Sequence, residues 1–595
     1  MDSGQRRKRK RLGRPLSYTQ FFFSPRTLFL CLSFFVFLLF LSSDRFSIGA
    51  SSFHPALSTS TLSLLYSSAS NSILDSFSTR LHPFRVEHRI LFPDHVLLMM
   101  NRKIRRSQEL ECVYYKLFNG SDERKRQLVD VQVQPVLSTD VYDVSRSIVR
   151  CPLARFNFSS AAVDLRQRGE MGSRNWYLRI NQTAHSWDKV AYEAGLDGDT
   201  VVVFVKGLNL RPHKISDPTR FRCHFGLRNL DKGNGLLLTT KAVTVAQEVV
   251  RCLLPRSIRN NPEKIQGVRV TVSHLTGHIR HPVRMLVPSV ARVRSYRAEA
   301  QKRNRVKHEL CVCTMVWNQA SALREWIVYH AWLGVERWFI YDNNSDDDIE
   351  KVVQDLDLQG YNVSRKSWPW IKTQEAGFSH CALRAKEECN WVGFFDVDEF
   401  FYFPNEFHSQ LGSGLPGENS LKSLVANFSS SNTVAEIRTA CHSFGPSGLS
   451  SPPNQGVTIG YTCRLQSPER HKSIVRPDLL DLGLLNVVHH FQLQEGYEHL
   501  NMPESSAIIN HYKYQVWETF KAKFFRRVAT YVVDWQEDQN KGSKDRAPGL
   551  GTEAIEPVNW RLRFCEVWDT GLKDFLLSYF ADPATGMLPW EKSSL

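Results

Sequence analysis

Three carboxylates interrupt a strongly apolar run in the second half of the chain. The run is WVGFFDVDEFFYF (391–403), and its acidic residues are Asp396, Asp398 and Glu399. Alternate residues of an extended strand point to the same side, so Asp396 and Asp398 can project together. Burying several carboxylates is costly unless a cation compensates them, and hard divalent metals favour carboxylate oxygens. An isolated Asp-x-Asp is common on surfaces, but at the end of a buried strand it predicts a metal that bridges the carboxylates to a diphosphate.

The segments before this run alternate between strand and helix patterns. ELCVCTMVW (309–317) predicts a buried strand, residues 320–333 carry apolar side chains at helical spacing, and ERWFIYDN (336–343) predicts another strand. Such a βαβ beginning predicts a parallel sheet with helices on its faces. Ligands of these sheets bind in the crevice at the carboxyl ends of the strands, where Asp396 and Asp398 would lie. We therefore expect an α/β domain over 308–595.

A region of short β-branched stretches precedes this domain. LVDVQVQPV (128–136) and VRVTV (268–272) alternate in the manner of half-buried antiparallel strands, and VVVFV (201–205) resembles a more central strand. Together they predict an all-β sandwich over 86–290. Residues 291–307 are basic and weakly patterned, which favours a linker or a solvated helix over a binding patch.

The N-terminus combines a basic tail (1–26) with one apolar run (27–43). Eight Lys and Arg residues and one Asp precede residue 27. This arrangement predicts a transmembrane signal anchor with a cytosolic tail, followed by a Ser/Thr-rich stem (44–85) and lumenal domains. A nuclear localisation signal would leave the apolar run unexplained, and a cleaved signal peptide lacks a clear cleavage site close behind it. The tail holds nearly half of the net charge of +16, which argues against a nucleic-acid-binding protein.

The composition fits a multidomain globular protein. With 595 residues, 42% of them apolar and 23% charged, the chain is too long for one compact core and too apolar to be disordered. Six sequons agree weakly with a lumenal location. They are Asn119, Asn157, Asn181, Asn343, Asn362 and Asn427.

Eleven of the twelve cysteines follow the apolar run, an odd number that leaves a free thiol or an intermolecular bond. Spacing alone suggests three disulfides, although it cannot fix the pairing. The suggested pairs are Cys112 with Cys151, Cys223 with Cys252 and Cys441 with Cys463. Cys311 and Cys313 lack the spacing and the histidine partners of a zinc site.

Four separated segments resemble glycosyltransferase family 92, which includes plant β-1,4-galactan synthases. They are 311–348 (CVCTMVWNQASALREWIVYHAWLGVERWFIYDNNSDDD), 394–401 (FFDVDEFF), 470–477 (RHKSIVRP) and 509–524 (INHYKYQVWETFKAKF). The resemblance covers roughly 305–540 and is specific, because the motifs occur in the same order. Over the β-rich part it is looser and resembles the carbohydrate-binding β-sandwich of galactan synthases.

The resemblance implies a GT-A-type fold and inverting transfer of a hexose, most favourably galactose from UDP-galactose, with Mn²⁺ as the cofactor. Asp396 and Asp398 would hold the metal and the donor diphosphate, Asp398 as the more direct ligand, with Glu399 beside them. His511 would be the third metal ligand, with His489 and His490 as alternatives. The residues expected around the uridine or ribose are Thr314, Val316, Asn318, Asp342 and Asn343. Lys472 and Arg476 would neutralise the leaving diphosphate, unless they are surface charges without a role.

Several roles stay open at this point. Inversion needs a base for the acceptor hydroxyl, and the conceivable ones are Glu399, Glu436, Glu469, Asp478 and Glu518. Arg324 and Glu325 suit either the donor pocket or an internal ion pair. Trp368, Trp370 and Trp568 suit either sugar stacking or the core. The protein is expected to be a Golgi membrane enzyme of single-pass type II topology that acts on a glycan or polysaccharide, with a homodimer as its expected assembly. The alternative is an inactive carbohydrate-binding or scaffold protein.

Overall fold

The structure is a computed structural model, and it describes only part of the chain. The described residues are 86–104, 109–115, 131–155, 158–169, 184–208, 215–226, 237–276, 283–301, 306–405, 417–487, 489–523 and 556–591. The predicted tail, anchor and stem lie outside them, as do the sequons at Asn119, Asn157 and Asn181. Within the described ranges, no helix is both long and apolar enough to cross a membrane.

The α/β domain is built on a nine-stranded mixed sheet within the described residues, with the strand order β19-β18-β17-β20-β24-β22-β28-β21 and β27 beside β22. β17, β18, β19 and β20 are parallel, and β24 runs antiparallel to β20. The first strands are β17 (His308–Val316), β18 (Arg337–Asp342), β19 (Val363–Ser367), β20 (Cys389–Phe394) and β21 (Glu399–Tyr402). The later strands are β22 (Val434–Ser443), β24 (Arg470–Val475), β27 (Glu498–Asn501) and β28 (Ile508–His511).

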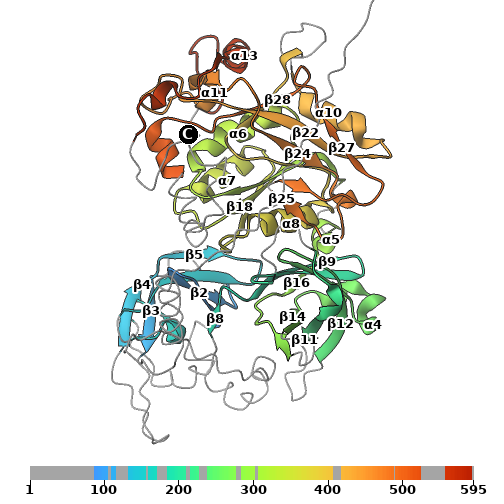
Figure 1. The fold of residues 1–595 in the computed structure, drawn as a ribbon. Helices are drawn as coiled ribbons and strands as arrows, with labels where there is room; N and C mark the ends of the chain where they lie inside the picture. The colour runs from blue at the N-terminus through green and yellow to red at the C-terminus, as the bar shows by residue number, and fades with distance from the viewer. Residues whose placement is uncertain are drawn as a thin grey trace, which may run out of the picture. The chain divides into compact units, whose positions relative to one another are not determined.

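Helices cover both faces of this sheet (Figure 1). The main ones are α6 (Ala320–Trp332), α7 (Ile349–Leu358), α8 (Gln374–Ala385), α10 (Ser420–Ser429) and α13 (Gly571–Tyr579). Alternate strand residues serve the two faces, since Leu310 and Val312 share a core with α6, α7 and α10, while Cys311 and Cys313 share one with α8. The sequence-predicted βαβ beginning is therefore confirmed.

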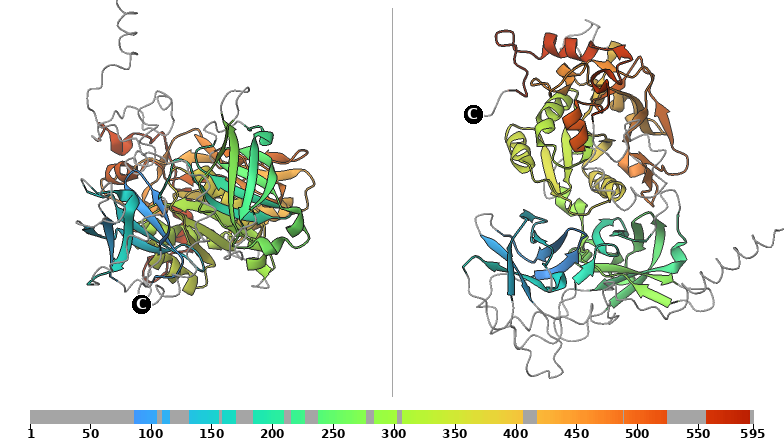
Figure 2. Two further views of the ribbon diagram at one scale, coloured as in Figure 1. Left: turned by 90° about the horizontal axis from the view of Figure 1, so that it is seen from below. Right: turned by 60° about the vertical axis from the view of Figure 1, so that its left-hand side comes forward.

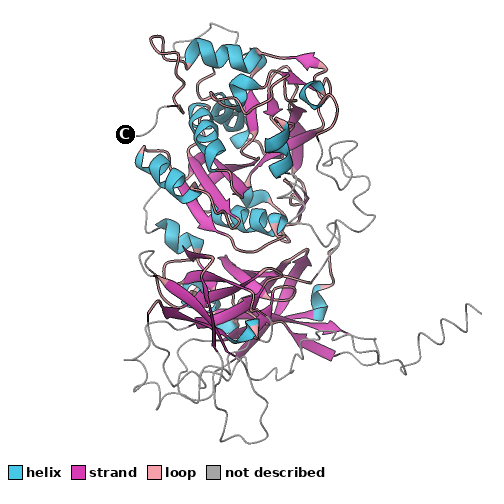
Figure 3. Ribbon diagram, turned by 90° about the vertical axis from the view of Figure 1, so that its left-hand side faces the viewer, coloured by secondary structure: helices cyan, strands magenta, loops and turns pink. Residues whose placement is uncertain are grey.

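The region before this domain is almost entirely β-structure (Figure 3). Its first part contains β1 (Val86–Leu91), β2 (His95–Met100), β3 (Leu110–Tyr115), β4 (Val131–Pro135), β5 (Ser138–Val141), β6 (Ser147–Pro152), β7 (Val163–Gln167) and β8 (Ala184–Ser186). Its second part contains β9 (Ala191–Asp197), β10 (Thr200–Val205), β11 (Phe221–Gly226), β12 (Leu237–Ala246), β13 (Val249–Leu253), β14 (Arg269–Thr276), β15 (Val283–Leu286) and β16 (Val293–Arg294).

These two parts have separate hydrophobic cores rather than the single sandwich expected over 86–290. One core joins the sheet β5-β6-β2-β1-β8 to the sheet β4-β3-β7, and the other lies within an eight-stranded sheet of the described residues, β15-β14-β11-β12-β13-β10-β9-β16. Figure 2 shows the two parts as separate groups of strands, in blue and in green. The basic segment 291–307 is less exposed than expected, because β16 pairs with β9 and the ring of Tyr296 is buried.

Both β-rich parts pack on the α8 face of the central sheet. Trp187 stacks on Trp370 with the ring centres 5.3 Å apart, and Tyr192 meets Trp368 edge-on at 6.1 Å. A Cβ at Gly195 would lie 2.5 Å from the side chain of Leu383 of α8 and 2.8 Å from the ring of Tyr296, so a larger residue would push these side chains away. Because the two regions share one apolar core, the β-rich region is part of the same folded body as the α/β domain.

Five disulfides involve ten of the eleven cysteines after the apolar run. Cys112–Cys151 and Cys223–Cys252 confirm two of the suggested pairs. The third suggestion is wrong, because Cys463 pairs with Cys565 and Cys441 is a buried free thiol. The remaining bonds are Cys311–Cys389 and Cys313–Cys381, which agrees with the rejection of zinc.

Candidate active site

The carboxylates lie in the tight reversal between β20 and β21. The backbone N–H of Glu399 donates to the carbonyl of Asp396 at 3.1 Å, and Glu399 Oε2 accepts from the N–H of Asp396 at 2.8 Å. β21 then pairs antiparallel with β28, and in this pairing Glu399 lies opposite His511. The reversal therefore carries Asp396 and Asp398 past the end of a buried strand and holds them beside His511.

Lys472 is the central cation of the site. Its Nζ lies 2.8 Å from Asp396 Oδ2, 2.9 Å from Glu399 Oε1 and 2.8 Å from Nε2 of His489. β24 places it there, because Ser473 pairs with Phe394 at the last position of β20. Lys472 is only 4% exposed, so it is not a surface charge without a role.

Asp398 has a second set of partners. Its Oδ2 contacts Nζ of Lys523, from the helical residues 517–523, and lies 3.6 Å from Nε2 of His511. Nδ1 of His511 is 3.6 Å from Glu399 Oε1. The structure thus brings His511 to the carboxylates and also places its rival His489 3.6 Å from Asp396. His490 instead bonds to Ser473 and Glu436.

Electrostatics keep the two aspartates ionised. Burial is the largest effect on Asp396 and would raise its pKa, but the charge of Lys472, the hydrogen bond that it donates and the other neighbours together hold that pKa below its usual value. Lys523 and His511 do the same for the pKa of Asp398. Burial raises the pKa of Glu399, and burial beside Lys472 lowers the pKa of His489 to about 3, so His489 is neutral at physiological pH.

The donor set fits a divalent metal such as Mn²⁺. Asp398, in the reversal before β21, lies beside His511 of β28, and the same carboxylate already attracts the cationic Lys523. In the described part of the chain, no three His, Cys, Asp or Glu side chains form a complete metal cluster. Oxygens from water or a diphosphate would therefore complete the coordination.

The residues expected around the nucleoside lie at the carboxyl ends of β17 and β18. Thr314 and Val316 are buried, and the N–H of Asn318 donates to Ser345 Oγ at 2.9 Å. Asp342 is 1% exposed and accepts from the N–H of Ser345 at 2.9 Å. Nδ2 of Asn343 donates to the carbonyls of Trp368 and Trp370 at 2.7 and 3.1 Å, so this side chain holds the loop rather than standing free.

Other predicted residues are placed elsewhere. Arg476 follows Val475, and Val475 pairs with Val392 away from the carboxylates. The guanidinium of Arg476 donates to the carbonyl of Ser431 at 3.1 Å. The structure therefore does not bring Arg476 to Asp396. Glu325 accepts from Thr458 and Val457 and has an internal structural role, whereas Arg324 is bonded to Gln359. Trp368 and Trp370 are core residues, and Trp568 is 62% exposed.

Comparisons with known proteins place this chain in a family. The model of glycosyltransferase family 92 matches residues 306–562. A glycosyltransferase family 92 protein of Ricinus communis is 62% identical over 593 residues, covering 100% of both chains. The chain belongs to glycosyltransferase family 92. The resemblance inferred from the four motifs is thus confirmed.

More distant similarities reach proteins with named sugars. The galactan β-1,4-galactosyltransferase GALS2 of Arabidopsis thaliana is 27% identical over 240 residues, which are 36% of this chain and 45% of that protein. Among solved structures, the mannosyltransferase PcManGT from Pyrobaculum calidifontis, in complex with GDP-Man and Mn2+, matches with 10% identity and a TM-score of 0.24. That match covers 41% of this chain and 72% of the other.

The structure narrows the choice of base in this family 92 protein. Glu399 and Glu436 have fully buried side chains, and Glu436 is bound by Arg438, Ser473 and His490. Asp478 lies two residues after Arg476, and Glu518 is 78% exposed near Lys521. Glu469 is 21% exposed and bonds to Ser443, which pairs with His511. Glu469 is therefore at the carboxylate edge.

Two site residues were not predicted from the sequence. Lys523 lies 125 positions from Asp398, and Arg365, which bonds to Asp342, sits on a strand without an acidic motif. Lys523 lies within the family segment 509–524, but nothing in the sequence pattern indicated that it pairs with Asp398.

Proposed function

We propose that this protein is an inverting, metal-dependent hexosyltransferase that moves galactose from UDP-galactose to a glycan or cell-wall polysaccharide. The observation that carries the proposal is the convergence of Asp396, Asp398, His511 and Lys472 at the edge where the β17 and β18 loops offer a nucleoside site. Membership of family 92 supports sugar transfer. The choice of galactose rests on the similarity to GALS2.

Each group has a distinct part in the proposed mechanism. Asp396, Asp398 and His511 would hold Mn²⁺ together with water or diphosphate oxygens, and the metal would supply positive charge to a diphosphate leaving group. Lys472 keeps both Asp396 and Glu399 in place, and its charge adds to the stabilisation of the leaving group. Glu469 removes the proton of the acceptor hydroxyl; its contacts with Ser443 and Lys513 lower its pKa against the effect of burial and keep it ionised.

The test is a transfer assay with residues 86–595 produced as a secreted fragment. A panel of UDP-sugars is offered with galactan and glycan acceptors, in Mn²⁺ or in chelator. We expect Mn²⁺-dependent transfer from UDP-galactose and a loss of about 100-fold or more in Asp398→Asn, because removal of a metal-holding charge weakens stabilisation of the transition state. Asp478→Asn is the matched control, since it removes a carboxylate far from the site.

Other outcomes would change the proposal. Transfer from a different UDP-sugar would replace galactose but keep the enzyme class. Equal activity in Mn²⁺ and chelator would contradict metal dependence. No turnover of any donor, with binding to glycans retained, would favour an inactive carbohydrate-binding protein.

The N-terminal pattern extends the proposal to cellular location. The basic tail and apolar run, 1–26 and 27–43, support a single-pass type II protein of the Golgi membrane with residues 44–595 in the lumen. The five disulfides support an oxidising compartment for the folded domains.

A further inference from the structure

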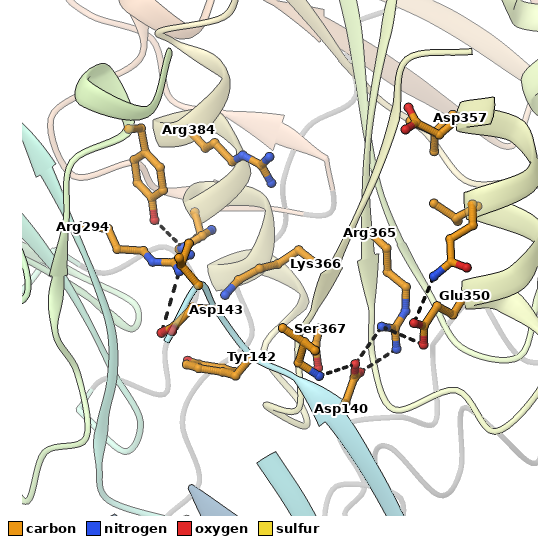
Figure 4. A pocket seen from close by; sticks show the side chains of 17 residues that line it. Asp140, Tyr142, Asp143, Arg294, Glu350, Asp357, Arg365, Lys366, Ser367 and Arg384 are labelled. Carbon is orange, nitrogen blue, oxygen red and sulfur yellow. Dashed lines mark hydrogen bonds and ion pairs between the residues drawn. The ribbon is translucent and has the colours of Figure 1, made fainter. Parts of the chain in front are cut away.

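An ion pair joins the β-rich region to the free edge of the central sheet. Arg365 lies on β19, the first strand in the sheet order, and Asp140 lies on β5. The guanidinium binds the carboxylate at two points, with Nη1 to Oδ1 at 2.9 Å and Nη2 to Oδ2 at 2.6 Å. Figure 4 shows the two side chains pointing toward one another, with Glu350 beside them. A bidentate pair of this kind fixes the plane of the guanidinium.

The same guanidinium reaches the nucleoside edge. Nε of Arg365 donates to Asp342 Oδ2 at 2.7 Å, and the other oxygen of Asp342 accepts from the N–H of Ser345 at 2.9 Å. Ser345 Oγ in turn accepts from the N–H of Asn318 at 2.9 Å. A continuous chain of polar contacts therefore runs from β5 to the loops after both β18 and β17.

Packing alone does not hold Arg365 in this position. Asp140 and Arg365 line two polar cavities of about 430 and 400 Å³. Arg365 and Asp140 have 17% and 18% exposed side chains, and Glu350 is 3.7 Å from the guanidinium. Because open volume lies beside the bridge, loss of Asp140 would leave the guanidinium free to turn toward Glu350 and away from Asp342.

We infer that Asp140 and Arg365 are positioning residues, through which the β-rich region sets the affinity of the catalytic domain for its nucleotide donor. This inference rests on the proposed function for the identity of the ligand, a uridine diphosphate sugar. It gives the β-rich region a role that does not require it to bind carbohydrate. Asp342 orients the donor, and Arg365 and Asp140 orient Asp342.

The test compares two variants of residues 86–595, each of which loses one ion pair between the regions. Asp140→Asn removes the charge that holds Arg365. Lys386→Gln is the matched control, because Lys386 binds Asp197 at 2.8 Å from the end of α8, away from the nucleoside loops. The measurements are UDP binding by titration calorimetry in Mn²⁺, and the kcat and KM for donor and acceptor.

In Asp140→Asn we expect the Kd for UDP and the donor KM to rise between about twofold and thirtyfold, the usual size of coupling through such a network. The acceptor KM and kcat should stay within about twofold of the parent. Lys386→Gln should bind UDP as the parent does, and Asp140→Glu should recover most of the affinity. Equal UDP affinity in Asp140→Asn and Lys386→Gln would overturn the inference.

A measurement without nucleotide separates this inference from the proposed function. Hydrogen–deuterium exchange at residues 343–348 should be faster in Asp140→Asn than in the parent and in Lys386→Gln. If the parent binds no UDP but this exchange still rises, the proposed function fails, and only the ordering of residues 343–348 by Asp140 and Arg365 stands. If exchange at these residues is unchanged, the positioning role fails whatever the activity.

Discussion

At the scale of single residues, Lys472 shows how the site tolerates three neighbouring carboxylates. Asp396 and Glu399 share its amino group, and Lys523 is the separate partner of Asp398. Burial would lower the pKa of Lys472, but the two carboxylates raise it above its usual value. The lysine therefore stays charged, and its charge is available to the diphosphate of the proposed donor.

Glu469→Gln tests the assignment of the base. The amide keeps the shape of the side chain but cannot accept a proton, so we expect kcat to fall by about 100-fold to 10,000-fold. The donor KM should change less than about threefold, because Glu469 is assigned no contact with the donor. Initial-rate kinetics with UDP-galactose and a galactan acceptor provide the measurement.

Ser443→Ala is the control for a structural effect of that change. It removes the hydroxyl that donates to Glu469 but leaves the carboxylate. If Ser443→Ala lowered kcat as much as Glu469→Gln does, both substitutions would act by disturbing the structure of the carboxylate edge and not by removing a base. A Glu469→Gln protein with the parent kcat would exclude Glu469 as the base.

Residue-scale prediction from sequence succeeded where one segment carried the signal. Asp396, Asp398 and Glu399 stand out against their apolar neighbours, and His511 and Lys472 lie in segments shared with the family. The partners of Lys523 and Arg365 could not be found in this way. Lys523 shares a segment with His511 but contacts Asp398 across 125 positions, and Arg365 lies on a strand outside the four family segments. Arg476 was misplaced since it is four residues from Lys472 on an extended strand, which carries it away from the carboxylates.

At the scale of elements, β9 and β19 are linked by a buried charge pair. Glu193 Oε1 lies 3.0 Å from Nζ of Lys366 and accepts from the hydroxyl of Tyr142 at 2.6 Å. Burial is the largest effect on Glu193 and would raise its pKa, but Lys366 and its other neighbours together outweigh burial and lower the pKa to about 2. The balance is different for Lys366. Burial outweighs the attraction of Glu193 there, so the pKa of Lys366 is lowered.

Glu193→Gln should destabilise the protein in a pH-dependent way. The folded pKa of Glu193 is about 2 and the unfolded value is 4.5, so its ionisation stabilises the fold above pH 4.5. That contribution is lost as the pH falls from about 4.5 to 2. We expect the variant to lose about 3 kcal/mol in the free energy of unfolding at pH 7, and less at pH 3. Denaturant unfolding at the two pH values measures both.

The double variant Glu193→Gln, Lys366→Met is the control for an unpaired charge. Glu193→Gln leaves the buried ammonium group of Lys366 without its charged partner, and this unpaired charge is the main source of the lost stability. Removing both charges should therefore restore much of the free energy of unfolding. A loss that is the same at pH 7 and pH 3 would contradict the assigned pKa.

At this scale the sequence predicted strand and helix positions better than pairings. The alternation of VRVTV located β14, and the apolar run ELCVCTMVW located β17, because each strand has its own pattern. The pairing of Cys441 with Cys463 failed because β23 (Cys463–Arg464) pairs with β29 (Val567–Trp568), which brings Cys565 to Cys463. No spacing rule contains that information.

At the scale of the whole molecule, the β-rich region and the α/β domain are not independent. Trp187 and Tyr192 from one meet Trp370 and Trp368 from the other inside a shared core. Sequence patterns predicted both regions in the right order. They could not predict the docking, because a strand face that packs on another domain has the same alternation as one that packs on its own sheet.

Asn427 offers a test of the proposed topology. Among the sequons in the described residues, Asn427 is exposed on α10, whereas Asn343 is bound to two carbonyls and Asn362 is bonded to Arg337. If the domains lie in the lumen, we expect a glycan at Asn427 that an endoglycosidase removes and that Asn427→Gln prevents. The readout is the mobility of the full-length protein from plant cells. An unmodified Asn427 with protease-accessible domains in intact vesicles would contradict the type II assignment.

The disulfides also constrain how the chain is made. Among the eleven cysteines that the structure describes, no bond joins the β-rich region to the α/β domain, and the bonded partners are 29 to 102 residues apart. Oxidation can therefore proceed during translation, from the first pair toward the last. The exception is a nested pair of bonds, in which Cys313–Cys381 lies within the loop closed by Cys311–Cys389. Cys311 and Cys313 can bond only after Cys381 and Cys389 have been synthesised, and they can then exchange partners. Recombinant production should accordingly depend on a host that supplies a disulfide isomerase.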